Sequence, residues 1–247
     1  MTEPIIETRG LTKRFGRFTA VDHITLSVMP GEIFGFLGAN GAGKTTAMRM
    51  LCGLSRPTEG WGRVAGCDIT RQPEAVKRHI GYMSQRFSLY DDLTVAENIR
   101  LFGGIYGLSR AELARRTDEL TGSLGMEAER RKRVAALPLG LKQRLAFSVA
   151  MLHRPPLVFL DEPTGGVDPV TRRAFWEMID EAAAAGTTVF VTTHYMDEAE
   201  YCHRVSVMVD GQIRALDTPE RLKQQFGATT MEDVFIGLAQ TAKRSQP

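Results

Sequence analysis

A short glycine-rich segment, residues 38–45, reads G-A-N-G-A-G-K-T and fits the pattern G-x-x-x-x-G-K-S/T. Glycine lets successive backbone N–H groups turn inward around a phosphate, and a helix that follows favours an anion at its N-terminus. Lys44 can then reach the β- and γ-phosphates, and the Thr45 hydroxyl can bind Mg²⁺. The segment predicts nucleotide contacts from Gly38, Asn40, Gly41, Ala42, Gly43, Lys44, Thr45 and Thr46.

Two adjacent acids, Asp161 and Glu162, end the apolar run 157–160. In doubly wound sheets ligands bind at the carboxyl ends of strands, so both side chains are expected near the phosphate loop. Asp161 then offers Mg²⁺ a hard oxygen ligand, and Glu162 can polarise a water against the γ-phosphate. Without a phosphate loop, an acidic helix cap or an exposed turn would be the better interpretation.

Two other polar residues follow strand-like stretches. His194 comes after the apolar run 187–192, where it would touch a γ-phosphate if that strand lies beside the strand of Asp161. Gln85 follows the stretch 80–84, and a glutamine there indicates nothing by itself. Both are therefore candidates only in the context of the phosphate loop.

A parallel sheet is needed to position these residues, and the apolar pattern predicts one. Runs that suit strands covered on both faces stand at 32–37, 157–160 and 187–192. Helices are predicted at 44–51, directly after the phosphate loop, and from the capping Asp168 to Gly186. Strands that alternate with helices predict an α/β fold.

Three other stretches complete the predicted organisation. Strand-like alternation at 5–8, a turn at Gly10 and a second alternating stretch at 20–28 open the chain. A hairpin is predicted at 205–215. The mostly helical pattern between 94 and 152 predicts an insertion between the halves of the sheet.

Composition restricts the class of protein. The chain has 247 residues with 31 basic and 29 acidic side chains, a formal charge of +2, which excludes a strongly basic nucleic-acid coat. Its three cysteines show no C-x-x-C spacing, which favours a reducing compartment. No apolar stretch approaches the length of a membrane span, so a soluble cytoplasmic protein is expected.

In their order along the chain, these motifs resemble those of the ATP-binding subunit of an ABC transporter. The phosphate loop matches Walker A, and residues 157–162 match Walker B with its catalytic glutamate. Gln85 matches the Q-loop glutamine and His194 the switch histidine, which implies catalytic roles for both and a Mg²⁺ contact for Gln85. Phe15 stands where the family stacks an aromatic ring on adenine. Residues 164–168 resemble the D-loop, which places Asp168 among the nucleotide contacts.

The resemblance covers about residues 5–220 and implies a fold. It implies an α/β P-loop NTPase (RecA-like) core with an N-terminal antiparallel β subdomain and an inserted α-helical subdomain at about 86–154. A single ABC ATPase domain is then expected at 1–225. A C-terminal tail at 226–247 follows it, with room for a short helix.

One motif departs from the family pattern. Where the family has L-S-G-G-Q, a loop that contacts the γ-phosphate bound by the partner subunit, residues 137–141 read L-P-L-G-L. Pro138 offers neither a hydroxyl nor an N–H. Leu139 and Gly140 remain expected contacts, because Gly140 keeps its N–H and a helix N-terminus still points at the phosphate. We favour a working variant over a weakened or asymmetric site, since the Mg²⁺ and general-base groups are present.

The variant string at 137–144 is similar to one in ATPases of ABC-2-type drug exporters. That resemblance implies an ATPase that uses ATP and Mg²⁺ and drives export of a drug or small hydrophobic molecule by closure of a homodimer or pseudo-symmetric dimer. A polytopic permease would hold the chain on the cytoplasmic face of the inner membrane. Residues expected to line the permease groove, or else to pack the insertion onto the core, are Phe87, Leu89, Tyr90 and Leu93.

Two alternatives stay open. ABC-type ATPases also act on nucleic acid or ribosomes, and the basic cluster at 130–133 could touch nucleic acid. Clustered charges are usually only solvated, and no nucleic-acid partner is expected. A non-hydrolysing nucleotide sensor is the second alternative, which the proline in the signature keeps open.

Overall fold

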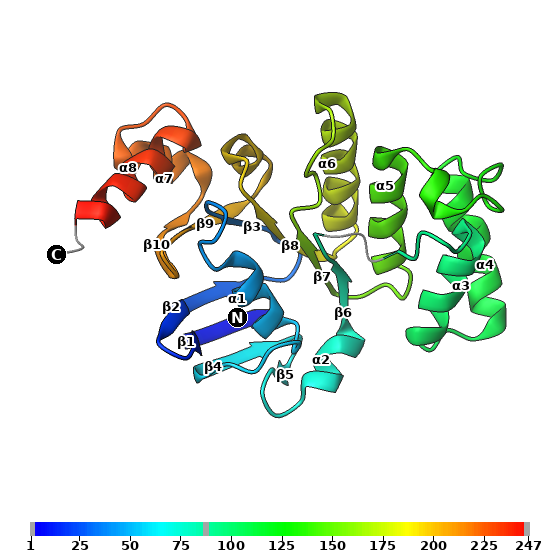
Figure 1. Ribbon diagram of the computed structural model, residues 1–247, viewed down its shortest axis with the longest axis horizontal. Helices are drawn as coiled ribbons and strands as arrows, with labels where there is room; N and C mark the ends of the chain where they lie inside the picture. Colours follow the sequence, from blue (N-terminus) through cyan, green and yellow to red (C-terminus); the bar gives the residue numbers. More distant parts are fainter. Residues whose placement is uncertain (1–2, 86–88, 245–247) are drawn as a thin grey trace.

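The computed structural model describes residues 3–85 and 89–244. Its centre is a six-stranded sheet in the order β10-β9-β3-β8-β7-β6, parallel except for the β9–β10 hairpin (Figure 1). The strands are β3 (Ile33–Leu37), β6 (Ile80–Met83), β7 (Leu157–Asp161), β8 (Thr188–Thr193), β9 (Arg204–Val209) and β10 (Gln212–Asp217). The predicted buried strands and the predicted hairpin are therefore confirmed.

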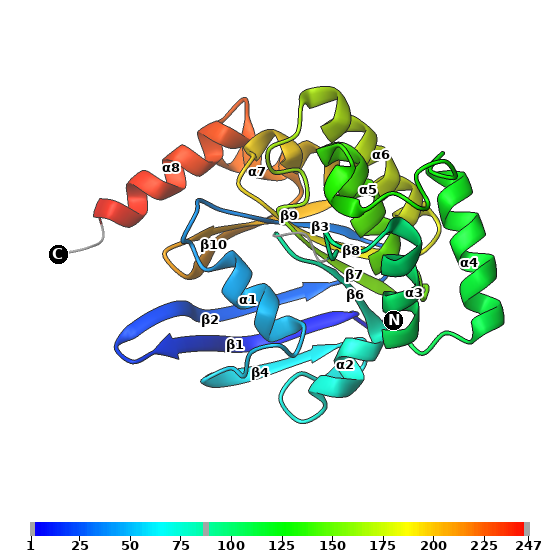
Figure 2. The same ribbon diagram turned by 45° about the vertical axis from the view of Figure 1, so that its right-hand side comes forward.

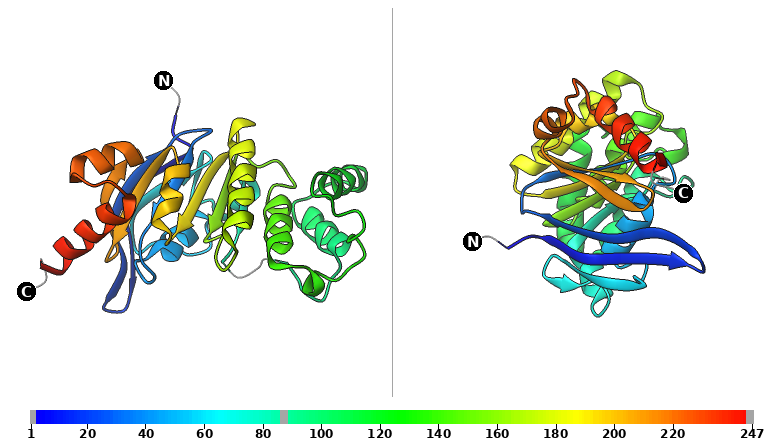
Figure 3. Two further views of the ribbon diagram at one scale, coloured as in Figure 1. Left: turned by 90° about the horizontal axis from the view of Figure 1, so that it is seen from above. Right: turned by 90° about the vertical axis from the view of Figure 1, so that its left-hand side faces the viewer.

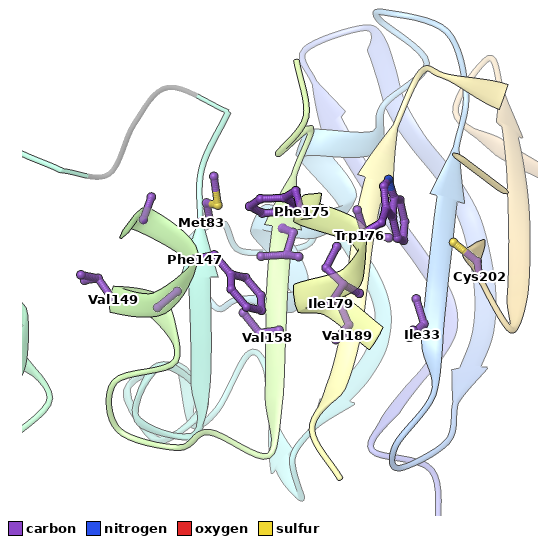
Figure 4. Close-up of a cluster of buried hydrophobic side chains, with 14 of the residues drawn as sticks. Ile33, Met83, Phe147, Val149, Val158, Phe175, Trp176, Ile179, Val189 and Cys202 are labelled. Atoms are coloured by element: carbon purple, nitrogen blue, oxygen red, sulfur yellow. The ribbon is translucent and has the colours of Figure 1, made fainter. Parts of the chain in front are cut away.

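The middle strands are apolar on both faces because both faces are covered. Every residue of β3, β7 and β8 is buried. Alternate residues enter two separate cores, so Val158 and Phe159 of β7 face opposite ways. Figure 4 shows one core, where Val158 of β7 lies beside Phe147, and the Phe147 ring in turn packs edge-on against Phe175 at 5.5 Å between centroids.

A second, antiparallel sheet forms the N-terminal part in the order β2-β1-β4-β5. Its strands are β1 (Ile6–Phe15), β2 (Phe18–Val28), β4 (Glu59–Val64) and β5 (Cys67–Asp68). The predicted turn at Gly10 is wrong. Gly10 has φ +57° inside β1, and the register shifts between Thr8 and Leu11, so this glycine makes a bulge and the strand continues.

The helix that follows the phosphate loop, α1 (Lys44–Leu51), lies between the two sheets (Figures 1 and 2). Its buried residues Ala47, Met48 and Leu51 belong to the same core as Phe36 of the parallel sheet and Val21 of the antiparallel sheet. Because both sheets hold this helix, its N-terminus is fixed relative to the ends of β3 and β7.

Of the remaining helices, α2 (Pro73–His79) packs through Val76 into the same core as α1, and the others cover the other face of the parallel sheet or extend beyond it. These others are α3 (Val95–Ile105), α4 (Arg110–Ser123), α5 (Leu139–Ala150), α6 (Pro169–Ala184), α7 (Pro219–Phe226) and α8 (Met231–Arg244), with short 3₁₀ turns η1 (Val134–Ala136) and η2 (Met196–Tyr201). The group α3 to α5 projects from one end of the sheet, in green in Figure 3. Capping boxes at Thr94–Glu97 and Ser109–Glu112 start α3 and α4.

This arrangement confirms the predicted fold class, a P-loop α/β core with an antiparallel β subdomain and an α-helical subdomain. The boundaries at 86–154, 1–225 and 226–247 stay predictions. Of the residues expected at the permease groove, Leu89 is buried and Tyr90 is 55% exposed, while Phe87 lies outside the described residues. Within the described ranges, none of the helices has both the length and the apolar character to cross a membrane.

Candidate active site

The phosphate loop joins the end of β3 to the start of α1. Lys44 is 4% exposed, and its Nζ donates to the carbonyl oxygens of Gly38 at 2.7 Å and Ala39 at 3.2 Å. Gly43 has φ +104°, and a Cβ there would collide with the Ala20 carbonyl. The loop is thus a tight backbone curve with one ammonium group held inside it, which suits a phosphate.

Asp161, the last residue of β7, meets the start of α1. Its Oδ1 accepts hydrogen bonds from Thr192 Oγ1 at 2.6 Å and Thr45 Oγ1 at 3.2 Å. Burial raises the pKa of this carboxyl above its usual value, against the opposing effect of the two hydroxyl donors. The hydroxyl and carboxylate oxygens are hard ligands of the kind that Mg²⁺ prefers.

The wider surroundings fit a metal that is held mainly by phosphate and water. Among the residues that the structure describes, no group of three or more His, Cys, Asp or Glu side chains could hold a metal ion. Mg²⁺ is usually bound through one or two protein groups together with substrate phosphates, and Thr45 and Asp161 offer two.

Glu162 gathers the other candidates around one carboxylate. Its Oε2 accepts from Gln85 Nε2 at 2.9 Å and lies 3.1 Å from His194 Nδ1, and its Oε1 lies 3.2 Å from Lys44 Nζ. The sequence predictions from four distant segments therefore meet at one point.

The backbone at Glu162 is in a costly conformation. Its φ is +50°, a left-handed region that residues other than glycine rarely adopt. The Glu162 N–H donates to both the carbonyl and the hydroxyl oxygen of Thr192, at 3.1 Å each. Such strain persists only where the surroundings over-determine it, and it concentrates at functional sites.

A cavity of about 310 Å³ opens beside these groups. Phe18 contributes to its wall, although the sequence pointed to Phe15. The two phenylalanines are paired directly opposite each other across the β1–β2 turn, and both are more than half exposed. The pairing of Phe15 with Phe18 could have been read from the two-residue turn Gly16–Arg17. The lining residues are Phe18, Ala20, Asn40, Gly41, Gly43, Lys44, Thr45, Thr46, Gln85 and Glu162.

Comparison with known proteins agrees with this geometry. The profile of the ABC transporter family matches residues 21–165, more than half of the chain. The chain belongs to the ABC transporter family. Its ATP-binding relatives include the probable multidrug ABC transporter ATP-binding protein YbhF of Escherichia coli, 46% identical over 241 residues. That match covers 96% of this chain but only 42% of YbhF, so the chain spans about two fifths of that relative's length.

Other relatives match over more of their own length. The daunorubicin/doxorubicin resistance ATP-binding protein DrrA of Streptomyces peucetius is 38% identical, with 92% of this chain and 69% of DrrA covered. Among solved structures, the ATP-binding subunit of an ABC transporter superposes with a TM-score of 0.85 at 30% identity, over 95% of this chain and 99% of that one. A dimeric ATP-binding cassette in a post-hydrolysis state, bound to ADP and Pi, gives 0.78 at 25%, over 86% and 98%.

The remaining predicted ABC motifs, the variant signature and the D-loop, come together at the N-termini of α5 and α6. Leu139, Gly140 and Asp168 line a second cavity of about 430 Å³, together with the first turns of α5 and α6. Pro138 occupies the N-cap position of α5 and provides no side-chain cap, whereas Asp168 caps α6 by accepting from the N–H groups of Val170 and Thr171. Two helix N-termini therefore lie side by side at this cavity, and Leu139 also lines a third cavity of about 220 Å³ together with Gln85 and Glu162.

Proposed function

We propose that this chain binds ATP with Mg²⁺, hydrolyses it and so powers a membrane exporter. The observation that carries the proposal is the convergence of Lys44, Gln85 and His194 on the carboxylate of Glu162. Lys44 and the N-terminus of α1 neutralise phosphate charge, and Glu162 orients or deprotonates the attacking water. His194 braces the γ-phosphate. Bound Mg²⁺, held by Thr45, Asp161 and Gln85, would supply charge stabilisation at the transferred phosphate.

We also propose that the chain pairs with a second ATP-binding cassette. Leu139, Gly140 and Asp168 line a cavity that includes no phosphate-loop residue, and we propose that they contact a nucleotide bound by the partner subunit. The dimeric cassette with ADP and Pi, 25% identical to this chain, supports that arrangement. ATP closes the dimer and hydrolysis opens it, with either a second copy or a homologous cassette as partner.

The transported molecule and the membrane partner follow from the relatives. YbhF is named as a probable multidrug transporter protein, and DrrA as a daunorubicin and doxorubicin resistance protein. On that basis the chain serves efflux of a drug or small hydrophobic molecule, on the cytoplasmic face of the cell membrane, through a polytopic permease. The relatives do not favour action on nucleic acid.

Glu162→Gln tests the proposal. The amide can still accept a hydrogen bond but cannot take a proton, so ATP should stay bound, phosphate release should stop and a closed dimer should accumulate. Phosphate release and size-exclusion chromatography at saturating ATP measure both effects. Lys44→Ala is the contrasting control, because it should lose nucleotide binding and dimer together. Wild-type phosphate release no faster than that of Glu162→Gln would sink the proposal and favour the nucleotide sensor.

A further inference from the structure

A buried carboxylate outside the site just described lies close behind it. Glu198, in η2, is completely buried. Its Oε1 accepts a hydrogen bond from Thr164 Oγ1 at 2.5 Å and lies 3.6 Å from Arg172 Nε. Within the described part of the chain, Oε2 of Glu198 has no hydrogen-bond partner. Burial of a carboxylate costs several kcal/mol, so this residue is a poor choice if its purpose is stability alone.

The contacts of Glu198 lead to the proposed catalytic groups by two routes. Thr164 follows Glu162 by two residues in the turn after β7, and Glu198 follows His194 by four residues after β8. The hydrogen bond between Thr164 and Glu198 therefore joins the two chain segments a second time, behind the 3.1 Å contact between His194 and Glu162. Together with the chain between them, the two contacts form a closed loop of interactions that restrains the side chains of Glu162 and His194.

A stack of three groups, Arg172, Tyr195 and His194, strengthens this closed loop of interactions. The Arg172 guanidinium lies over the Tyr195 ring, 4.1 Å from its centroid, and the Tyr195 ring lies 4.2 Å from that of His194. Arg172 also reaches Asp197 at 3.5 Å. Because Arg172 stands in the first turn of α6, the stack connects the helix that Asp168 caps with the His194 segment.

We infer that Glu198 is a positioning residue for ATP hydrolysis, holding Glu162 and His194 in register through Thr164 and Arg172. The inference rests on the proposed function and deepens it. A displacement of about 1 Å in a reacting group can cost a factor of roughly 100 in rate, whereas nucleotide binding depends on the phosphate loop. Loss of this closed loop of interactions should therefore lower kcat and leave nucleotide affinity unchanged.

The test uses the purified 247-residue chain and measures ATP turnover and the affinity of a fluorescent ATP analogue. Glu198→Gln and Thr164→Val should each lower kcat by about tenfold or more, with KM changed less than about twofold. Thr164→Ser keeps the hydroxyl donor and should recover most of the rate. In a His194→Ala background, Glu198→Gln should lower kcat by a smaller factor than in the wild type, because part of its effect acts through His194.

A matched control separates positioning from stability. Glu32 is another buried carboxylate paired with an arginine, Arg204 at 3.2 Å, but it directly precedes β3, at the opposite end of that strand from the phosphate loop. Glu32→Gln should lower the melting temperature and leave kcat alone. The Trp176 ring is stacked on Tyr201 of η2, 5.0 Å away between centroids. In a Trp61→Phe background, the fluorescence of Trp176 therefore shows whether η2 stays packed.

The possible results are distinguishable. If Glu198→Gln and Thr164→Val keep the wild-type kcat while η2 stays packed, the inference is overturned and the proposed function still stands. The inference would also be overturned if kcat in these variants falls no more than it does in Glu32→Gln at the same loss of melting temperature. If the wild type itself turns over no faster than Glu162→Gln, the proposed function fails and the inference with it.

Discussion

At the scale of single residues, the site combines stabilising contacts with groups that work against stability. Lys44 is almost fully buried, Glu162 has a left-handed backbone, and burial raises the pKa of Asp161. Each of these features costs free energy in the folded chain. Their clustering around one cavity is what a prepared phosphate site requires, because preorganised groups need no rearrangement during reaction.

Asp161→Asn should therefore stabilise the chain while abolishing hydrolysis. A carboxyl whose pKa is raised on folding binds its proton more tightly in the folded state, so its contribution to stability falls as pH rises through that raised pKa. The neutral amide removes this penalty and can still accept from Thr192. We expect a melting temperature a few degrees higher at pH 7, with the difference vanishing as pH falls towards the usual aspartate value of about 4. A lower melting temperature at pH 7 would contradict this account.

At the scale of elements, contact between α5 and α6 sets the geometry of the variant signature. A Cβ on Gly140 would stand 2.5 Å from Thr171 Cγ2, and the Thr171 hydroxyl donates to Asp168 Oδ2 at 2.6 Å. The glycine therefore allows the two helix N-termini to approach each other, which the sequence pattern alone did not reveal.

Gly140→Ala should lower the free energy of unfolding by about 1–3 kcal/mol through overpacking. Thr171→Ser removes only the obstructing methyl group and keeps the hydroxyl, so the double variant should regain most of the loss. Gly104→Ala in α3 is the matched control, because its Cβ would meet open space and should be neutral or stabilising by up to about 1 kcal/mol. Urea denaturation of the wild type, Gly140→Ala, the double variant Gly140→Ala/Thr171→Ser and Gly104→Ala measures these free energies. A double variant as unstable as Gly140→Ala would exclude the steric explanation.

Local patterns predicted some elements well and others not at all. The buried strands were readable because every position of β3, β7 and β8 except Asp161 is apolar or small, and α1 was readable from the motif before it. The bulge at Gly10 was missed because only pairing with neighbouring strands distinguishes a bulge from a turn. That Phe18 rather than Phe15 lines the cavity depends on how the β1–β2 hairpin meets the phosphate loop, which no local pattern encodes, and Phe15 as an adenine contact stays a prediction.

At the scale of the whole molecule, the residues predicted to contact nucleotide lie on two surfaces. One surface carries the phosphate loop and Glu162, and the other carries Leu139, Gly140 and Asp168. In the proposed dimer, the second surface would meet a nucleotide held by the partner subunit. The α-helical group that projects in Figure 3 carries the second surface through α5, so closure of the proposed dimer would move those helices.

Tyr90→Asp should disconnect this movement from transport. Tyr90 is 55% exposed at the start of the helical group, and its ring lies 6.3 Å from that of Phe102 in α3, a helix whose Leu101 and Ile105 are also exposed. Exposed apolar side chains of this kind suit a membrane protein's cytoplasmic helix, and a buried interfacial charge would weaken that contact. We expect less permease to co-purify and drug efflux to fall, while the isolated chain binds ATP with unchanged affinity.

Leu54→Asp, which also charges an exposed apolar position but lies after α1, is the control that should retain efflux. Equal loss of ATP binding and efflux in Tyr90→Asp would instead mean that Tyr90 only packs the helical group onto the core.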